Sequence, residues 1–337
     1  MGIIDALSAG YKLISRRWWL ILVPVVLDLF LWMGPQLALT KVIDEAASML
    51  TVPDGVEISE EYASYMAQMQ QTLQLVSEDA NLFGLLGVGL PGIPSLMAAT
   101  TTDVQLLPVA PVVMQLNGIG QAILWGLLLM VAGTLLTSVY VSWIGRAVLA
   151  EYRETRDTPI IEHSFKTWLQ VLLFIVGLVA LVVVLGIPIG FVVALVSLLS
   201  SSFGIMLLYV VSLFALWFGV WLVIYLYFVI DAIVLDRVNI LKAIWHSVNV
   251  VLRNFWPTFG LIVLVWVINA GMTLIWQQFA FASWGVLIGI VANAFVGSGL
   301  IAASLIFYNE RFARWQENPG TAGLSLLFRR WGGPKAS

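Results

Sequence analysis

Six hydrophobic stretches in this chain are each long enough to cross a lipid bilayer. About 20 apolar residues in a helix span the hydrocarbon core, and a lipid-exposed backbone must satisfy its hydrogen bonds within helices or a closed barrel. Only 10% of the 337 residues are charged, against about 25% in soluble domains. The sequence therefore predicts an all-α polytopic membrane protein. Its six transmembrane helices are expected at residues 18–39, 119–147, 168–196, 205–230, 255–276 and 284–308.

The basic residues lie almost entirely on one side of these predicted spans. Fifteen of the 16 Lys and Arg residues fall in the two terminal tails and in the second-to-third and fourth-to-fifth connections, and Lys41 is the one on the other side. Positive residues in short connections stay in the cytoplasm. Both termini are therefore expected to be cytoplasmic.

The segments outside the spans are of two kinds. Residues 1–17 and 238–254 have apolar residues at helical spacing, which predicts amphipathic helices on the cytoplasmic membrane surface. In the second of these, Ile244 and Val248 are expected to face lipid and Asn249 to face water. Residues 309–337 form a cytoplasmic tail.

The largest predicted connection, residues 40–112, carries nine acidic residues and is expected to be extracytoplasmic. Within it, residues 82–97 are apolar but interrupted by Gly and Pro, which break helices. This stretch either folds back onto the protein's own outer surface or the lipid headgroups, or it docks a membrane-protein partner. The first interpretation is favoured, and the second stays open.

Residues 13–22, 164–173 and 250–259 share a weak repeat, in which basic residues precede an aromatic start to a span. The repeat predicts three hairpins that each enter from the cytoplasm. The alternative is that every inner interface selects basic and aromatic residues. The GIPIG sequence at residues 186–190 is expected to bend or break the third span.

One segment supports a resemblance to a known group. Residues 241–265 read LKAIWHSVNVVLRNFWPTFGLIVLV. They resemble the repeated element of poorly characterised bacterial six-span membrane proteins, which are similar to the membrane domain of some glycerophosphodiester phosphodiesterases. The resemblance is carried by Ser247, by Arg253–Asn254–Phe255–Trp256 and by the apolar span that follows. It implies a multi-pass protein of the bacterial cytoplasmic (inner) membrane and transfers no catalytic residue.

Asp28 is the one ionisable residue deep in a predicted span. It follows Arg17 by 11 residues, or roughly 16 Å along a helix. A charge near the bilayer centre costs about 2.5–3.5 kcal/mol. Asp28 is therefore either a proton-carrying or cation-binding carboxylate, or a protonated or hydrogen-bonded residue, expected as a neutral acid, that ties the first span to a Ser, Thr or Asn on another span. Asn269 and Asn293 are the other candidate intramembrane polar residues, for which helix packing is the competing interpretation.

Two further patterns have structural interpretations. Small or weakly polar residues spaced by four are expected to mark close helix packing; they are Thr134, Ser138 and Ser142, and Gly289, Asn293 and Gly297. Tyr225, Tyr227, Asp231 and Asp236 gather at an inner boundary, where a solvated interface accounts for them.

Recognisable catalytic and cofactor signatures are missing from the sequence. The absence of cysteine excludes disulfides and thiolate chemistry. His163 and His246 are far apart in the chain, and no zinc, phosphate-loop or nucleotide motif occurs. The dispersed basic residues do not form a nucleic-acid surface. We expect no catalytic residue, metal or cofactor.

Two classes of function remain open from the sequence. The expected one is a non-catalytic scaffold or accessory subunit of a membrane complex, in contact with the lipid bilayer and with a membrane-protein partner through residues 82–97 and the spans. The alternative is a transporter or channel for a small or lipid-like solute that uses Asp28. A lipid-active enzyme is a weaker third possibility.

Overall fold

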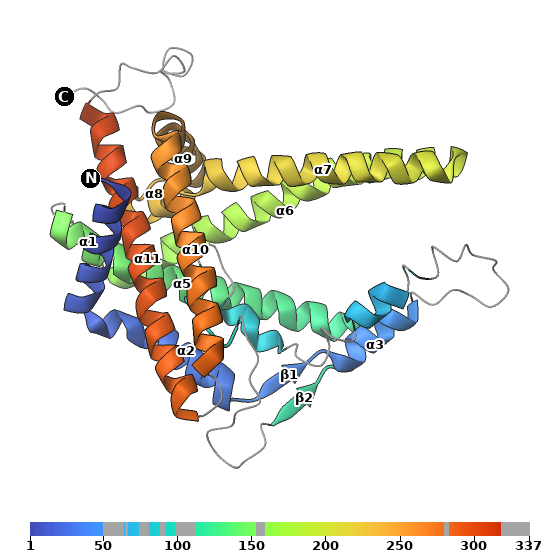
Figure 1. Ribbon diagram of the computed structural model, residues 1–337, viewed down its shortest axis with the longest axis horizontal. Helices are drawn as coiled ribbons and strands as arrows, with labels where there is room; N and C mark the ends of the chain where they lie inside the picture. Colours follow the sequence, from blue (N-terminus) through green and yellow to red (C-terminus); the bar gives the residue numbers. More distant parts are fainter. Residues whose placement is uncertain are drawn as a thin grey trace. The chain divides into compact units, whose positions relative to one another are not determined.

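The computed structural model describes residues 1–49, 64, 67–73, 81–87, 92–98, 112–152, 159–279 and 283–317. Helices make up most of this part of the chain (Figure 1), which confirms the predicted all-α class. In the described ranges, five helical segments are long and apolar enough to cross a membrane. They are Ile119–Tyr152 (α5), Ile160–Leu199 (α6), Ser202–Asp236 (α7 with α8), Phe255–Trp276 in α10 and Trp284–Glu317 in α11. The chain is a multi-pass membrane protein.

The first predicted span is shorter than expected. A 3₁₀ turn at Trp18–Ile21 (η1) leads into α2, Leu22–Met33, and the whole apolar segment is too short to count among the five. The helix ends because Gly34 is extended, with ψ −177°. Gly34 precedes Pro35, and a residue before proline is disfavoured in the helical region. The apolar residues that follow form β1, Gln36–Ala38, instead of more helix.

The third predicted span is not broken at residues 186–190. Helix α6 runs from Ile160 to Leu199 with Pro188 inside it, and so begins eight residues before the expected start at residue 168. Helices in lipid tolerate an internal proline. Ser200 then joins α6 directly to α7, Ser201–Leu226.

Two compact units make up the chain. Unit 1 comprises Met1–Arg16, Val141–Ile268 and Gly299–Ser337, and unit 2 comprises Arg17–Tyr140 and Asn269–Ser298. The division therefore passes through α5, through α10 (Phe255–Phe279) and through α11 (Ser283–Glu317).

In unit 1 the core surrounds α8, Val229–Asp236, whose residues from Val229 to Leu235 are all buried. Helix α1, Ile3–Arg16, lies against α11 here: a Cβ placed on Gly10 would come within 2.6 Å of the Gly299 carbonyl oxygen. The apolar face of α1 is thus buried in protein, where the sequence predicted a membrane-surface helix.

Helix α9, Ile240–Arg253, differs from its prediction in the same way. Ser247, Asn249 and Val250 are buried, so the expectation that Asn249 faces water is wrong. The physical reason is that α9 packs against α7 and α8, and its small and polar residues form that contact. Ile244 and Val248 are only partly exposed.

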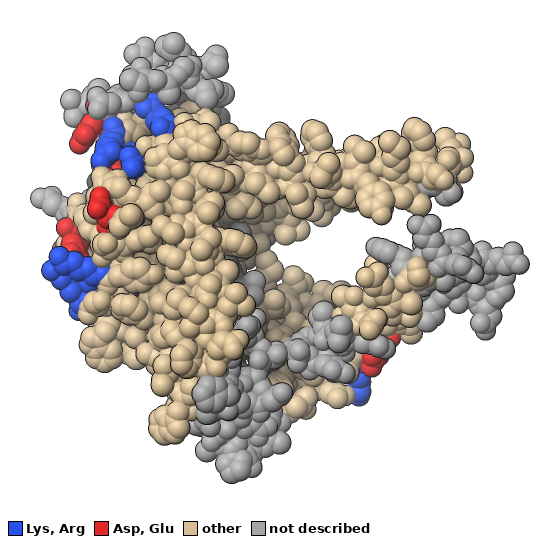
Figure 2. Space-filling model, in the orientation of Figure 1, with Lys and Arg blue, Asp and Glu red and all other residues tan. Residues whose placement is uncertain are grey.

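The rest of α6 and α7 has very little protein around it. The two helices lie along each other and extend away from α8 and α9 (Figure 1). We call residues 175–223 the α6–α7 arm. Most large apolar side chains of the arm are exposed, Leu213 by 70%. The face in view in Figure 2 shows no Lys, Arg, Asp or Glu on the arm.

Unit 2 is built around α2, the unit 2 part of α5, and short irregular segments. β1 pairs in parallel with β2, Val113–Gln115, in the register Gln36↔Val113. Leu37, Leu116 and Leu129 form a buried cluster, against which a 3₁₀ helix, Leu82–Leu86 (η2), packs. Helix α3, Thr40–Met49, follows β1.

The described part of the predicted outer segment folds back onto the helices of unit 2. The Leu85 carbonyl oxygen would lie 2.6 Å from a Cβ on Gly133 of α5. Phe83 packs edge-to-face on Phe30 of α2, with ring centroids 5.5 Å apart. The favoured interpretation of residues 82–97 is therefore supported in residues 82–87 and 92–97, which are the described ones.

Candidate functional site

Asp28 is fully buried in α2 and is held by the segment 92–98, which we call the clasp segment. The Ser95 hydroxyl and the backbone N–H of Met97 donate to Oδ1, and the N–H of Leu96 donates to Oδ2. The N–O distances are 3.1 Å for Met97 and 2.9 Å for Leu96. The expected partner on another span is thus replaced by a loop 67 residues further along the chain.

All the partners of Asp28 in the described ranges are donors. A carboxylate accepts hydrogen bonds only, whereas a protonated acid needs an acceptor for its own proton. The Ser95 hydroxyl receives the N–H of Ala98 at 3.0 Å and directs its own proton at Asp28. The arrangement therefore fits a carboxylate that fixes the clasp segment on α2.

Asn293 lies on the helix that borders the clasp segment. It is buried in α11 between Gly289 and Gly297. A Cβ on Gly297 would lie 2.2 Å from the Cβ of Pro94, and a Cβ on Gly289 would lie 3.2 Å from Leu96. The spacing of four does mark close packing, as predicted, but in these contacts the partner is a loop and not a helix.

Asn269 is not part of this group. Its side chain is exposed on α10, and the hydroxyl of Thr273 donates to its backbone carbonyl at 2.9 Å. Of the three predicted site residues, the structure therefore places Asp28 on the clasp segment and Asn293 between two glycines that contact it, and leaves Asn269 apart.

The carboxylates at the inner boundary are buried, so the prediction of a solvated interface is wrong for them. Asp231 accepts from the Ser304 hydroxyl at 2.6 Å, and Asp236 accepts from the Tyr308 hydroxyl at 2.5 Å. Ser304 and Tyr308 are one turn apart on α11. The two carboxylates thus anchor α8 to α11, which the sequence could not show because the partners are more than 70 residues apart.

His246 completes this inner cluster. Its Nδ1 lies 3.2 Å from Asp236 Oδ2, and its ring packs on Phe312, with centroids 4.7 Å apart, and on Trp315. Aspartate next to histidine is a pairing used in catalysis. Here the His246 side chain is only 9% exposed, and a structural role accounts for the arrangement.

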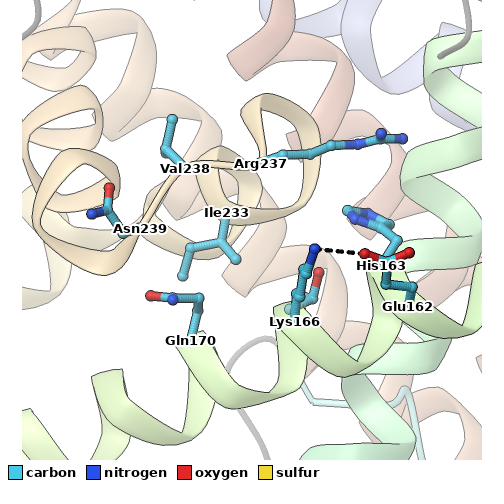
Figure 3. A pocket seen from close by; sticks show the side chains of 9 residues that line it. Glu162, His163, Lys166, Gln170, Ile233, Arg237, Val238 and Asn239 are labelled. Carbon is cyan, nitrogen blue, oxygen red and sulfur yellow. Dashed lines mark hydrogen bonds and ion pairs between the residues drawn. The ribbon is translucent and has the colours of Figure 1, made fainter. Parts of the chain in front are cut away.

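A pocket of about 460 Å³ opens in unit 1 where α6 begins beside the turn between α8 and α9 (Figure 3). Its polar lining comes from two elements, α6 and the turn; the residues are Glu162, His163, Lys166, Thr167 and Gln170 on α6, and Arg237 and Asn239 on the turn. We call it the basic pocket. Lys166 and Glu162 form an ion pair at 2.6 Å.

The basic pocket was not predicted from the sequence. The signal that was present is the spacing of His163, Lys166 and Gln170, which places them on one face of a helix. The other wall could not be foreseen, because Arg237 adopts a left-handed conformation with φ 55°. A non-glycine residue rarely does so, and it turns the chain from α8 into α9.

Comparison with protein-family models, with curated proteins and with solved structures finds no match to this chain. The proposals below therefore rest on the residues and on the geometry.

Proposed function

We propose that this chain is a non-catalytic integral membrane protein that serves as a scaffold or accessory subunit. Its place is the bacterial inner membrane, with both termini in the cytoplasm, as the distribution of basic residues favours. The α6–α7 arm would hold the apolar helices of a partner membrane protein. The observation that carries the proposal is the exposure of the arm.

Lipid can cover the length of the arm. Its α6 part, residues 175–199, is about 38 Å long at 1.5 Å per residue, which a tilted helix fits into a hydrocarbon core about 30 Å thick. The proposal of a protein partner therefore rests on the exposure of the arm and on the side chains that it presents.

Helix α7 also presents an aromatic ladder that suits such a contact. Phe214, Trp217, Trp221 and Tyr225 follow one another on one face, with successive ring centroids 5.7 Å, 6.0 Å and 5.7 Å apart. Trp217 is 56% exposed. Aromatic anchors are enriched at the centres of protein interfaces.

Site-specific photo-crosslinking in intact cells tests this proposal. A benzoylphenylalanine at Leu213 or Val182 of the arm should give one discrete protein adduct. The matched control is Trp266 on α10, which has the same 70% exposure as Leu213 and should give lipid adducts only. Lipid adducts alone at all three positions would contradict the proposal.

The transporter alternative makes a different prediction for Asp28. A carboxylate on a solute path must be reached by that solute, so it should react with dicyclohexylcarbodiimide in native membranes. A carboxylate that accepts three donors from the clasp segment should be protected. We expect protection, measured by mass spectrometry of the peptide that contains Asp28. Fast modification in folded protein would favour transport.

A further inference from the structure

The side chains that line the basic pocket offer a ligand hydrogen bonds and little free charge. Lys166 is paired with Glu162 at 2.6 Å, and Glu162 is the one carboxylate among the lining residues. Arg237 has interactions of its own. Figure 3 shows its guanidinium group beside His163 and away from Gln170. A cation would therefore find no unpaired carboxylate in the pocket wall, and an anion would compete with an existing ion pair.

Two buried side chains in the pocket wall have hydrogen-bonding atoms that the described residues leave unused. Thr167 is 2% exposed, and its hydroxyl group has no hydrogen-bond partner in this part of the chain. His163 is 6% exposed; one ring nitrogen donates to the backbone of Val234, and the other, Nε2, has no partner. The buried ring is neutral, so Nε2 is an acceptor. A buried polar atom without a partner costs free energy, and a ligand with hydrogen-bond donors would offset that cost.

Two amide groups complete the uncharged part of the lining. The side-chain oxygen of Gln170 accepts the N–H of Ile240 at 2.8 Å, which leaves the Gln170 NH₂ group as a donor. Asn239 precedes α9, and its side chain makes no cap hydrogen bond. Each amide combines donor and acceptor atoms. The pocket therefore presents donors and acceptors on groups that carry no charge.

A hydroxyl group suits this lining better than a charged group does. A hydroxyl donates one proton and also accepts through two lone pairs, so the hydroxyls of one ligand can donate to His163 and accept from Gln170. An ionised phosphate or carboxylate has only acceptor atoms and would face the lone pair of Nε2. An ammonium group has only donors, and its natural partner, Glu162, is already paired. The lining therefore favours an uncharged ligand with several hydroxyl groups.

We propose that the basic pocket binds a sugar or a similar uncharged polyol, either as the headgroup of a glycolipid or as a free molecule. Its hydroxyl groups would donate to His163 and Thr167 and accept from Gln170 and Asn239. The pocket volume of about 460 Å³ lies within the usual range for small-molecule sites, about 300–1,000 Å³. This site goes beyond the proposed scaffold function and does not depend on it.

The test uses the full-length protein in phosphatidylcholine nanodiscs. One arm measures retention of glucosyl diacylglycerol by native mass spectrometry, and the other measures binding of methyl glucoside by calorimetry. Thr167→Val should weaken binding about three- to tenfold, since it removes one hydrogen bond between uncharged groups. The matched control is Thr258→Val. Thr258 is also buried in unit 1 with a hydroxyl group that has no partner among the described residues, but it lies outside the pocket lining, so this variant should bind as the wild type does.

Each outcome decides the proposal. Glycolipid retention that depends on Thr167, without a response to methyl glucoside, identifies a glycolipid headgroup site. Binding of methyl glucoside that depends on Thr167 identifies a site for a free sugar. No saturable binding of either probe, binding that Thr167→Val leaves unchanged, or equal weakening by Thr258→Val would overturn the proposal. Thermal unfolding shows whether each variant is folded, and Asn239→Ala decides in the same way if Thr167→Val is not.

Discussion

The α6–α7 arm and the inner core of unit 1 are both strongly apolar, yet the side chains of the arm are exposed and those of the core are buried. In α6 and in the segment Ser202–Asp236, only 6% of the most apolar stretch is buried, against 61% in Trp284–Glu317. The two regions also differ in which polar residues they contain. The buried region holds Asp231 and Ser304 and the Asp236 side chain, which is 6% exposed, whereas residues 175–223 include no charged side chain and are polar only through Ser and Tyr hydroxyl groups.

This difference teaches that, in a chain of this kind, polar residues mark the interior of the protein. A side chain exposed to lipid can make no hydrogen bond there, so polar groups gather where protein partners satisfy them. The predictions below test that rule, first in unit 2 and then within unit 1.

The largest effect is expected at Asp28. Asp28→Leu would leave the three donors of the clasp segment without an acceptor, so we expect a loss of about 3 kcal/mol or more in unfolding free energy. Asp28→Asn should lose about 1–2 kcal/mol, because its NH₂ group would face one of those donors. Thermal unfolding in mild detergent measures both. If both variants match the wild type, the clasp segment is not held by this residue.

Within unit 1, Asp236→Leu should destabilise the inner core by about 2–3 kcal/mol, because the Tyr308 hydroxyl and His246 would lose their shared acceptor. The control is Tyr308→Phe, which removes one hydrogen bond and should cost about 1 kcal/mol. Chemical unfolding of the purified protein compares them. A larger loss for Tyr308→Phe than for Asp236→Leu would contradict the assignment.

Substitution of two glycines of unit 1, one in the core and one in the arm, tests the difference in packing between these regions. Gly10→Ala should cost about 1–3 kcal/mol, because the new methyl group would collide with the backbone of Gly299 and Ala303. Gly177→Ala in the arm has nothing within 4 Å of its new Cβ and should gain up to about 1 kcal/mol in helix propensity. Melting temperatures that move in the same direction for both variants would break the comparison.

The smallest effect on stability is expected on the arm itself. Leu213→Ala should change the unfolding free energy by less than about 0.5 kcal/mol, because the side chain contacts lipid or detergent whether or not unit 1 is folded. Recovery of the proposed partner should nevertheless fall. A variant that unfolds the protein would show that Leu213 belongs to the core.

Local patterns in the sequence were sufficient for the fold class and for several helix positions. Helices α5 and α10 begin at Ile119 and Phe255, where they were predicted. The first span was predicted to end at residue 39, which is too far along the chain, because the residues after Pro35 are also apolar. The sequence Gly34–Pro35 already indicates the end of a helix. Apolar residues alone do not distinguish a strand from a helix over so short a stretch.

The contacts of the site residues were harder to predict, because the residues that make them are far apart in the sequence. Asp28 is recognisable as a lone carboxylate, but its partners at residues 95–97 lie in an irregular loop that no periodicity describes. Asp231 and Asp236 look like ordinary boundary residues until α11 covers them. The basic pocket depends on the left-handed Arg237, a conformation that the surrounding fold imposes and that no local rule requires.

The separation between Asp28 and its donors has a consequence for how the protein is made. Synthesis proceeds at about 5–20 residues per second, so a gap of 67 residues means that the carboxyl emerges about 3–13 s before Ser95 does. During that interval the Asp28 carboxyl lacks the three donors that bind it in the folded protein. We therefore expect α2 to stay with the insertion machinery until the clasp segment has been made. A nascent chain arrested while residue 90 is the last to emerge should release α2 on alkaline extraction, and one arrested with residue 130 exposed should retain it.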